Sequence, residues 1–181
     1  MARIPLIAHA DELPAAHRDV WTRIAQSRGN VAGPFTALLH SPVLAGRTAD
    51  LGAYVRFEST LPPDVREIVI LSVARIFDCR FEWAYHVPEA RKAGVTAETI
   101  AAIRARRAPA DQDEATIVRY VGQLLVTHRA DDATVAALRE RLGLQGVVEL
   151  TATIGYYAML ACTLNAFDVR PEPGQEELDV S

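Results

Sequence analysis

The chain has 181 residues, of which 50% are hydrophobic and 23% are charged, and its formal net charge is -4 at pH 7. This length and composition allow one compact domain with its own core. The Lys and Arg residues are dispersed and form no basic stripe, which argues against nucleic acid as the main partner. The apolar stretch at the N-terminus is too short for a signal peptide. Cys79 and Cys162 lie far apart in the sequence and form no disulfide framework, so we expect a protein of the reducing cytoplasm.

Apolar residues recur at helical spacing along the chain, and no segment has the alternation that is typical of a strand. We expect a first helix over residues 11–28, with Gly29 as its stop. Ser41 and Pro42 are residue types favoured at the N-cap and at the first helical position, and they predict a second helix that ends near Ser59. The chain is therefore expected to be all-α.

Residues 66–94 contain most of the side chains that can support chemistry. The segment opens with an apolar run over residues 68–77, which is too long for an ordinary strand and contains no Gly or Pro, so we expect a buried helix. Asp64 and Glu67 have the spacing of a capping box at the start of this helix. Further along, Pro88 is expected either to kink the helix that contains it or to start a new turn.

Cys79, Glu82 and His86 follow the apolar run at positions i, i+3 and i+7. At about 100° per residue, their Cβ atoms fall within about 60° of arc on one face of a helix. We therefore expect a thiol, a carboxylate and an imidazole on one stripe. Glu67 is expected to reach the same pocket.

Shorter helices and one long helix are expected after this segment. Gly94 and Thr96 predict a helix end and a new N-cap, and Asp111 begins a further capping box. Residues 147–167 are apolar over a length that could span a membrane. Polar residues interrupt them and no Lys or Arg cluster flanks them, so we expect a buried or interface helix and no membrane.

At these residues the sequence resembles the carboxymuconolactone decarboxylase superfamily, which also contains alkylhydroperoxidase D (AhpD). In the peroxidase branch the motif is a Glu, eleven intervening residues, and then Cys-x-x-Cys-x-x-x-His. Glu67, Cys79 and His86 match this motif, but Glu82 stands in the position of the second cysteine. The decarboxylase branch looks like Glu-x-x-x-His followed by an Ala-rich turn that ends in Gly, and residues 82–96 are similar to that as well.

The resemblance covers residues 44–94 and, more loosely, residues 120–167. It implies a compact AhpD-like helical bundle over residues 1–167 that acts on a small-molecule substrate. Residues 168–181 contain Pro, Gly and Glu, and this composition predicts an extended tail. The excess of apolar helix surface over what one small domain can bury also predicts a homo-oligomer. Four residues are expected to be catalytic by the resemblance: Glu67, Cys79, Glu82 and His86.

Each motif residue also has a purely structural explanation. Glu67 alone is typical of a helix start, where a capping box and the helix dipole satisfy it. A lone cysteine such as Cys79 is most often a small buried hydrophobe, and Glu82 and His86 can form a structural pair at i and i+4. The joint occurrence of all four at the family spacing, beside an apolar segment where burial perturbs pKa values, favours a functional site.

Two reactions can use these residues. In the first, Glu82, His86 and Glu67 form an acid/base system for proton transfer at a carbon beside a carbonyl, which is the chemistry that lactone decarboxylation in the resembled family implies. In the second, Cys79 is the redox-active thiol of a peroxidase, and Glu67 and His86 relay protons.

Neighbouring charges favour the acid/base reaction. Asp78 and Glu82 both disfavour a thiolate at Cys79, and a local dithiol cycle is impossible without the second cysteine. We therefore predict a cofactor-independent lyase of the carboxymuconolactone decarboxylase type that acts on a small carbonyl or lactone compound. The alternative is an AhpD-like thiol peroxidase that uses an external thiol or a disulfide to Cys162.

Arg75 and Tyr85 are the candidates for substrate binding. Arg75 interrupts the apolar run, and its guanidinium needs an anionic partner, either a protein carboxylate or a substrate carboxylate. Tyr85 flanks the stripe, where it packs against a neighbouring helix or reaches the substrate. Glu82 and His86 lack the third ligand that a catalytic metal needs, so we expect no metal, and the acid/base reaction requires no cofactor.

Overall fold

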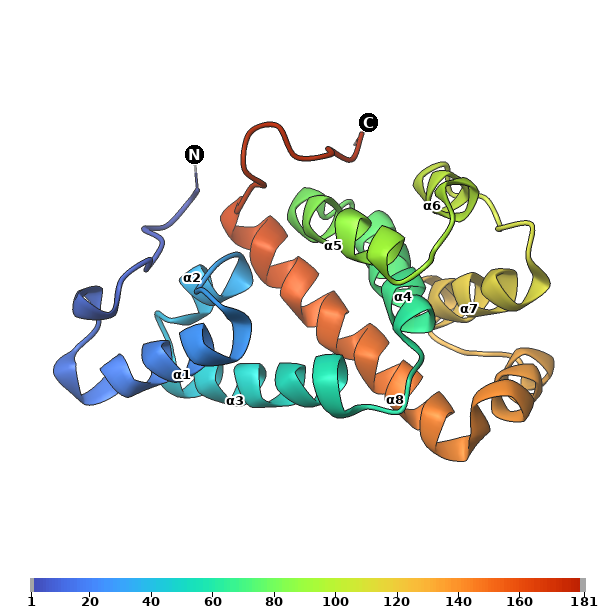
Figure 1. Cartoon of the computed structure of the whole chain (residues 1–181), viewed down its shortest axis with the longest axis horizontal. Coiled ribbons are helices and arrows are strands. Elements are labelled where there is room, and N and C mark those ends of the chain that lie inside the picture. Colours follow the sequence, from blue (N-terminus) through green and yellow to red (C-terminus); the bar gives the residue numbers. More distant parts are fainter. Residues whose placement is uncertain (1, 180–181) are drawn as a thin grey trace.

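The computed structural model describes residues 2–179, and its regular elements over that range are all helical (Figure 1). The α-helices in this range are α1 (Arg18–Arg28), α2 (Pro34–Leu38), α3 (Pro42–Ala53), α4 (Pro63–Ile76), α5 (Arg80–Lys92), α6 (Ala97–Arg104), α7 (Gln112–Gly122) and α8 (Asp132–Phe167). The shorter elements are the 3₁₀ turns η1 (Ala10–Glu12) and η2 (Ala15–His17) and the π-helical turns η3 (Tyr54–Glu58) and η4 (Gln123–Thr127). The prediction of an all-α fold is confirmed.

Helix α4 lies at the centre of the domain and packs against α5, α6, α7 and α8. Ile68, Val69, Ile70 and Leu71 are successive residues that point in different directions around α4, yet each is at most 1% exposed. A helix that is apolar all round is stable only when it is covered all round. The predicted buried helix is therefore confirmed, and it carries Glu67 into the interior of the domain.

The chain leaves the helical conformation between α4 and α5. Asp78 has a left-handed backbone with a φ of 49°, and Cys79 is extended, with a φ of -82° and a ψ of 95°. Helix α5 begins at Arg80 and continues through Pro88 to Lys92. Glu67 and the apolar run therefore lie on α4, whereas Glu82 and His86 lie on α5, which packs against α4.

Two predicted helices have different bounds in the structure. Residues 11–28 form η1, η2 and a shorter α1, because Leu13 and Pro14 are extended and the residue before a proline disfavours the helical conformation. Helix α8 includes the predicted helix over residues 147–167 but begins at Asp132. It crosses a kink at Gly143, whose φ of 71° is readily adopted by glycine.

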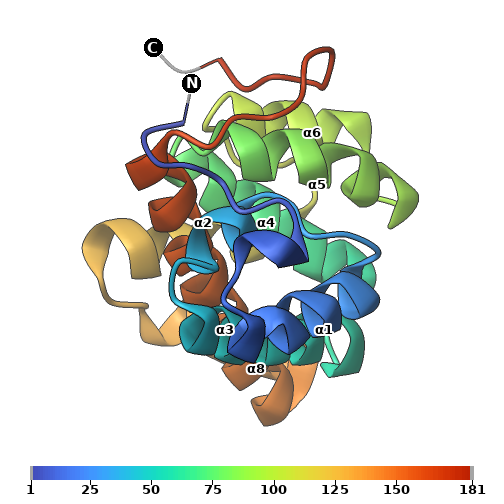
Figure 2. The same ribbon diagram turned by 90° about the vertical axis from the view of Figure 1, so that its left-hand side faces the viewer.

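The N-terminal helices and the C-terminal tail cover this central part. Helices α1, α2 and α3 enclose a second apolar cluster that includes Ile24, Phe35 and Leu39, and α2 packs on α8 (Figure 2). Residues 168–179 form no helix or strand and lie beside α5 and α6 (Figure 2). In this tail Leu178 is buried, and Glu176 forms ion pairs with arginines of α5 and α6.

Among the described residues, α8 is the helix that is long and apolar enough to cross a membrane, judged by length and composition alone. Within its qualifying window, 56% of the residues are buried inside the domain. Core helices of compact domains satisfy the same criteria, because a protein core and a membrane both select apolar side chains. The position of α8 thus agrees with the expected buried helix.

Candidate active site

Glu67 of α4 and Glu82 and His86 of α5 meet in the interior of the domain. His86 Nδ1 lies 2.8 Å from Glu67 Oε2, and His86 Nε2 lies 3.4 Å from Glu82 Oε2. The three residues are 6%, 4% and 3% exposed, in sequence order. The imidazole therefore lies between two buried carboxylates, with one at each ring nitrogen.

The surroundings of His86 determine its charge and its orientation. Burial acts to lower the pKa of His86, but the hydrogen bond to Glu67 and the contact with Glu82 raise it to about 9. At neutral pH the ring is therefore cationic, and both of its N–H groups point to carboxylates. Two tyrosine rings, those of Tyr85 and Tyr157, pack edge-on against the imidazole, with centroid distances of 5.1 Å and 5.3 Å.

The prediction that Glu67 reaches the pocket is wrong in this structure, because Glu67 lies behind His86 and is not part of the pocket wall. Its second oxygen, Oε1, lies 3.7 Å from Nε of Arg66, a partly buried arginine on the same helix. A carboxylate in this position can orient an imidazole and stabilise its positive charge without touching the substrate, as the third member of a catalytic triad does.

Glu82 and His86 line a small pocket that is open to solvent and has a cavity volume of about 60 Å³. Tyr85, Tyr156 and Tyr157 contribute the aromatic part of its wall. Burial, together with the negative charge of Glu82, raises the pKa of Tyr157 well above its usual value, so its hydroxyl stays protonated. Tyr85, which the sequence suggested as a substrate-binding residue, lines this pocket.

Arg28 and Arg56 also line this pocket, and they were not among the residues that the sequence suggested. Arg28 is the last residue of α1, and Arg56 lies within η3. Both arginines are far from Glu82 and His86 in the sequence. Only the packing of separate elements brings the four residues to one pocket. The sequence contains no local signal for their position.

The prediction that Cys79 shares the pocket is wrong in this structure. Because the chain is extended at Cys79, the thiol does not continue the stripe of Glu82 and His86. It is fully buried in an apolar cluster with Ala37 and Leu164, and it does not line the pocket. Burial, together with the charge of Glu82, raises the pKa of the Cys79 thiol to about 12.

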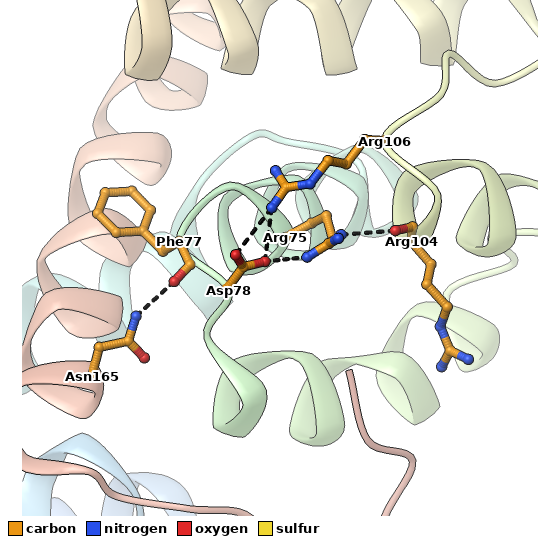
Figure 3. A network of polar contacts seen from close by, with 6 residues as sticks. All are labelled: Arg75, Phe77, Asp78, Arg104, Arg106 and Asn165. Atoms are coloured by element: carbon orange, nitrogen blue, oxygen red, sulfur yellow. Dashed lines mark hydrogen bonds and ion pairs between the residues drawn. The ribbon is translucent and has the colours of Figure 1, made fainter. Parts of the chain in front are cut away.

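The prediction that Arg75 binds substrate beside the motif is also not supported by its position. Arg75 donates from Nε to the carbonyl oxygen of Arg104 at 2.7 Å and forms an ion pair with Asp78 (Figure 3). Arg106 Nη2 donates to the same carboxylate at 2.9 Å and 3.1 Å. The anionic partner that Arg75 needs is therefore a protein carboxylate, which fastens the turn between α4 and α5 to the end of α6.

The carboxylates of Glu67 and Glu82 and the imidazole of His86 are not arranged as ligands of one metal ion. Glu67 and Glu82 contact opposite ring nitrogens of His86, so the three groups do not converge on one point. Within residues 2–179, no group of three or more His, Cys, Asp or Glu side chains has the arrangement of a metal site. The arrangement suits proton transfer along a line from Glu67 through His86 to Glu82 and the pocket.

The fold and the site define an all-helical domain with a buried carboxylate–imidazole–carboxylate group beside a solvent-open pocket. Residues 42–119, which contain all three of these side chains, match the model of the carboxymuconolactone decarboxylase family. A comparison with curated proteins finds no significant match to the sequence.

Several solved structures share the fold. The chain is similar to an uncharacterized peroxidase-related protein from Ralstonia eutropha JMP134, which is described as an alkylhydroperoxidase AhpD core. The two have 16% sequence identity and a TM-score of 0.76, and the similarity covers 95% of this chain and 93% of the other. An uncharacterized peroxidase-related protein from Silicibacter sp. TM1040 has 16% identity and a TM-score of 0.74, with coverage of 94% and 95%. A protein of unknown function from Agrobacterium tumefaciens, described as an AhpD-type antioxidant defence protein, has 21% identity and a TM-score of 0.63, with coverage of 75% and 94%. The family match over residues 42–119 confirms the resemblance of the motif, and the solved structures show that the chain shares their fold.

Proposed function

We propose that this protein is a cofactor-independent acid/base enzyme that decarboxylates a small carbonyl or lactone compound or catalyses a related lyase reaction. The observation that carries this proposal is the line of Glu67, His86 and Glu82, which begins in the core and ends at the pocket. A buried ionisable group of this kind, beside a pocket, is typical of general acid/base catalysis. The free state of both thiols agrees with a reducing cytoplasm as the proposed location.

Each residue has a separate role in this reaction. In decarboxylation the C–C bond breaks, CO₂ leaves, and the electron pair passes into the carbonyl to form an enolate. A proton then moves from His86 through Glu82 to the carbon, and water returns a proton to His86. Glu82 and His86 line the pocket and are the proposed catalytic residues, whereas Glu67 is a positioning residue that holds the imidazole.

The alternative is a thiol peroxidase that uses Cys79, and the descriptions of the structural neighbours as peroxidase-related favour it. A peroxidatic cysteine reacts as the thiolate and must be accessible. The Cys79 thiol is buried, and its pKa is raised to about 12 by burial and by Glu82. These properties support the acid/base proposal over the thiol mechanism.

The test of this proposal compares variants on a panel of β-keto acids and lactones. Nuclear magnetic resonance in D₂O would follow both the loss of CO₂ and the incorporation of deuterium at the carbon beside the carbonyl. Glu82→Gln and His86→Ala should each lower the rate by about 100-fold or more, the usual contribution of a general acid or base. Cys79→Ser should retain most of the activity.

Glu89→Gln is the matched control for this test. Glu89 also lies on α5, but it faces Lys92 at 2.7 Å and is not part of the pocket. Its variant should react at the wild-type rate. Equal rates for wild type, Glu82→Gln and His86→Ala, or loss of the reaction in Cys79→Ser, would refute the acid/base mechanism.

A further inference from the structure

Two arginines of the pocket lack a carboxylate partner in the protein. Arg28 and Arg56 line the pocket together with Glu82 and His86. Within residues 2–179, neither forms an ion pair with an Asp or Glu side chain, whereas Arg75 and Arg104 each do. Both are partly buried, and a guanidinium that is withdrawn from water usually has an anionic partner.

The environment of Arg28 leaves one donor unused. Its Nη2 donates to the carbonyl oxygen of Ala49 at 3.0 Å, and its Cζ lies 4.5 Å from the centre of the Phe35 ring. Its Nε is buried and has no hydrogen-bond acceptor among the described residues. A buried donor without an acceptor is costly, so the protein itself leaves the hydrogen-bonding capacity of Arg28 only partly used.

Close packing holds Arg28 beside Tyr156 at the pocket. Gly52 of α3 has no room for a side chain, because a Cβ there would lie 2.0 Å from the Tyr156 hydroxyl and 2.7 Å from Nη2 of Arg28. The Arg28 guanidinium and the Tyr156 hydroxyl are therefore neighbours, pressed against the backbone of α3. Such a contact limits the freedom of Arg28, which is a property of a preorganised binding group.

Arg56 is presented to the pocket by η3, and π-helical turns of this kind are frequent at functional sites. Its guanidinium carbon lies 5.9 Å from the centre of the Tyr85 ring. The turn is fastened to α8 by Glu149, which accepts hydrogen bonds from the Tyr54 hydroxyl at 2.6 Å and from the Thr60 backbone amide at 2.8 Å. The segment that carries Arg56 is therefore fixed on both sides.

The balance of charge at the pocket also favours an anion. Glu67 and Glu82 both face His86, and Glu67 also faces Arg66 at 3.7 Å. The positive charge of Arg28 and Arg56 therefore remains without a carboxylate partner among the described residues. An anionic ligand would neutralise it, and Glu82 would repel that anion toward the arginines.

We infer that Arg28 and Arg56 form an anion-binding subsite that holds a carboxylate of the substrate while Glu82 and His86 act on a carbon elsewhere in the same molecule. This inference rests on the proposed function and adds the residues that select the substrate. A carboxylate fits the planar fork of a guanidinium through paired hydrogen bonds. Arg56 lies within residues 42–119 but Arg28 lies outside them, so part of this selectivity comes from a segment that the family match does not include.

The experiment titrates small acids and their uncharged amides into the wild-type protein and follows binding by ligand-observed nuclear magnetic resonance. The pairs are acetate with acetamide, benzoate with benzamide, and 5-oxotetrahydrofuran-2-carboxylate with its carboxamide. At least one acid should bind about 10-fold or more tightly than its amide, because hydrogen bonds to a charged group contribute on that scale. If no acid binds more tightly than its amide, the subsite does not exist.

Variants assign the effect to the two arginines. Arg28→Gln and Arg56→Gln should each weaken binding of the acid about 10-fold, and Arg→Lys at either position should recover part of it. Arg23→Gln on α1 and Arg47→Gln on α3 are exposed controls that should bind as wild type does. Thermal unfolding verifies that each variant is folded. Unchanged binding in folded Arg28→Gln and Arg56→Gln would overturn the assignment.

Glu82→Gln separates this inference from the proposed function. Loss of the Glu82 charge should abolish catalysis but leave binding of the acid undiminished, since it removes a repulsive neighbour. If the acid/base proposal were wrong and the subsite correct, the arginine variants would still lose binding while Glu82→Gln left turnover unaffected. Weaker acid binding in Glu82→Gln would count against the placement of the anion near the arginines.

Discussion

At the scale of single residues, the central feature is an imidazole enclosed by two carboxylates. Each ring nitrogen of His86 faces one carboxylate, so protonation satisfies both contacts at once. In the unfolded chain the His86 pKa returns to about 6.5, whereas in the folded chain it is about 9. The cationic ring therefore contributes to stability, and its contribution depends on pH.

The raised pKa of His86 determines how the stability of the protein should change with pH. The contribution of His86 should be fully present below pH 6.5 and be lost as the pH rises through about 9, because the raised pKa means that only the folded state still binds the proton in that interval. The free energy of unfolding, from urea titrations between pH 6 and 9.5, should fall by about 1–3 kcal/mol more in wild type than in His86→Gln. His9→Gln, at an exposed position, should behave as wild type does. Parallel curves for wild type and His86→Gln would show that His86 is not charged in the folded protein.

Cys79 and Cys162 differ in exposure, and this difference gives a second prediction at the residue scale. Cys79 is buried, with a thiol pKa raised to about 12 by burial and by Glu82, while Cys162 is exposed. Hydrogen peroxide at neutral pH should therefore modify Cys162 first and leave Cys79 reduced. Mass spectrometry of the digested protein, with Cys162→Ser as the control, measures the order. Rapid stoichiometric formation of a sulfenic acid at Cys79 would instead favour the peroxidase alternative.

At the scale of elements, the contact between η3 and α8 determines where Arg56 lies. Glu149 of α8 is buried and accepts hydrogen bonds from Tyr54, Thr60 and Gln145. Burial acts to raise the pKa of Glu149, but these hydrogen bonds lower it to about 2. The carboxylate thus joins one side of the pocket to the long C-terminal helix.

Glu149→Gln should loosen this contact. A neutral amide accepts fewer and weaker hydrogen bonds than a carboxylate, so the free energy of unfolding at pH 7 should fall by about 1–3 kcal/mol. In wild type, the contribution of Glu149 should be present above pH 4.5 and be lost as the pH falls through about 2, because its folded pKa is depressed. Acid titration of both proteins measures this loss. Glu140→Gln, an exposed position on the same helix, is the control, and equal stability of the two variants would contradict the role of Glu149.

At the scale of the whole molecule, some apolar side chains remain on the surface. Leu144 and Val148 are 65% and 61% exposed, and their i, i+4 spacing places them on one face of α8. Val43 and Phe57, near α3, are also exposed. Large apolar side chains that are exposed on one face of a helix are typical of an association site. We propose a homo-oligomer that buries this face of α8 against another copy.

Val148→Glu should weaken that association, because a carboxylate would be buried in the interface without a partner. Light scattering at micromolar concentration should give a multiple of 19.8 kDa for wild type and a smaller mass for the variant. Val126→Glu, at an exposed apolar position on η4, should leave the mass unchanged. A wild-type mass of one chain would contradict the oligomer.

The sequence by itself determined the helical character of the chain and the pair Glu82 and His86. Both depend on local spacing: apolar periodicity defines a helix, and i, i+4 residues share a face wherever that helix lies. Glu67 could be predicted through the resemblance of the motif. The burial of residues 68–77, which follow Glu67, could also be predicted, because this segment is apolar on every side of its helix.

Tertiary structure decided which other residues reach the pocket. A left-handed backbone at Asp78, tied to Arg75 and Arg106, turns Cys79 into the core, and spacing arguments that assume a continuous helix do not detect such a turn. Arg28 and Arg56 come to the pocket through the packing of α1 and η3, across large separations in sequence. The side chains that carry the proposed chemistry are therefore encoded by local periodicity, and those proposed to bind the substrate are brought into place by the fold.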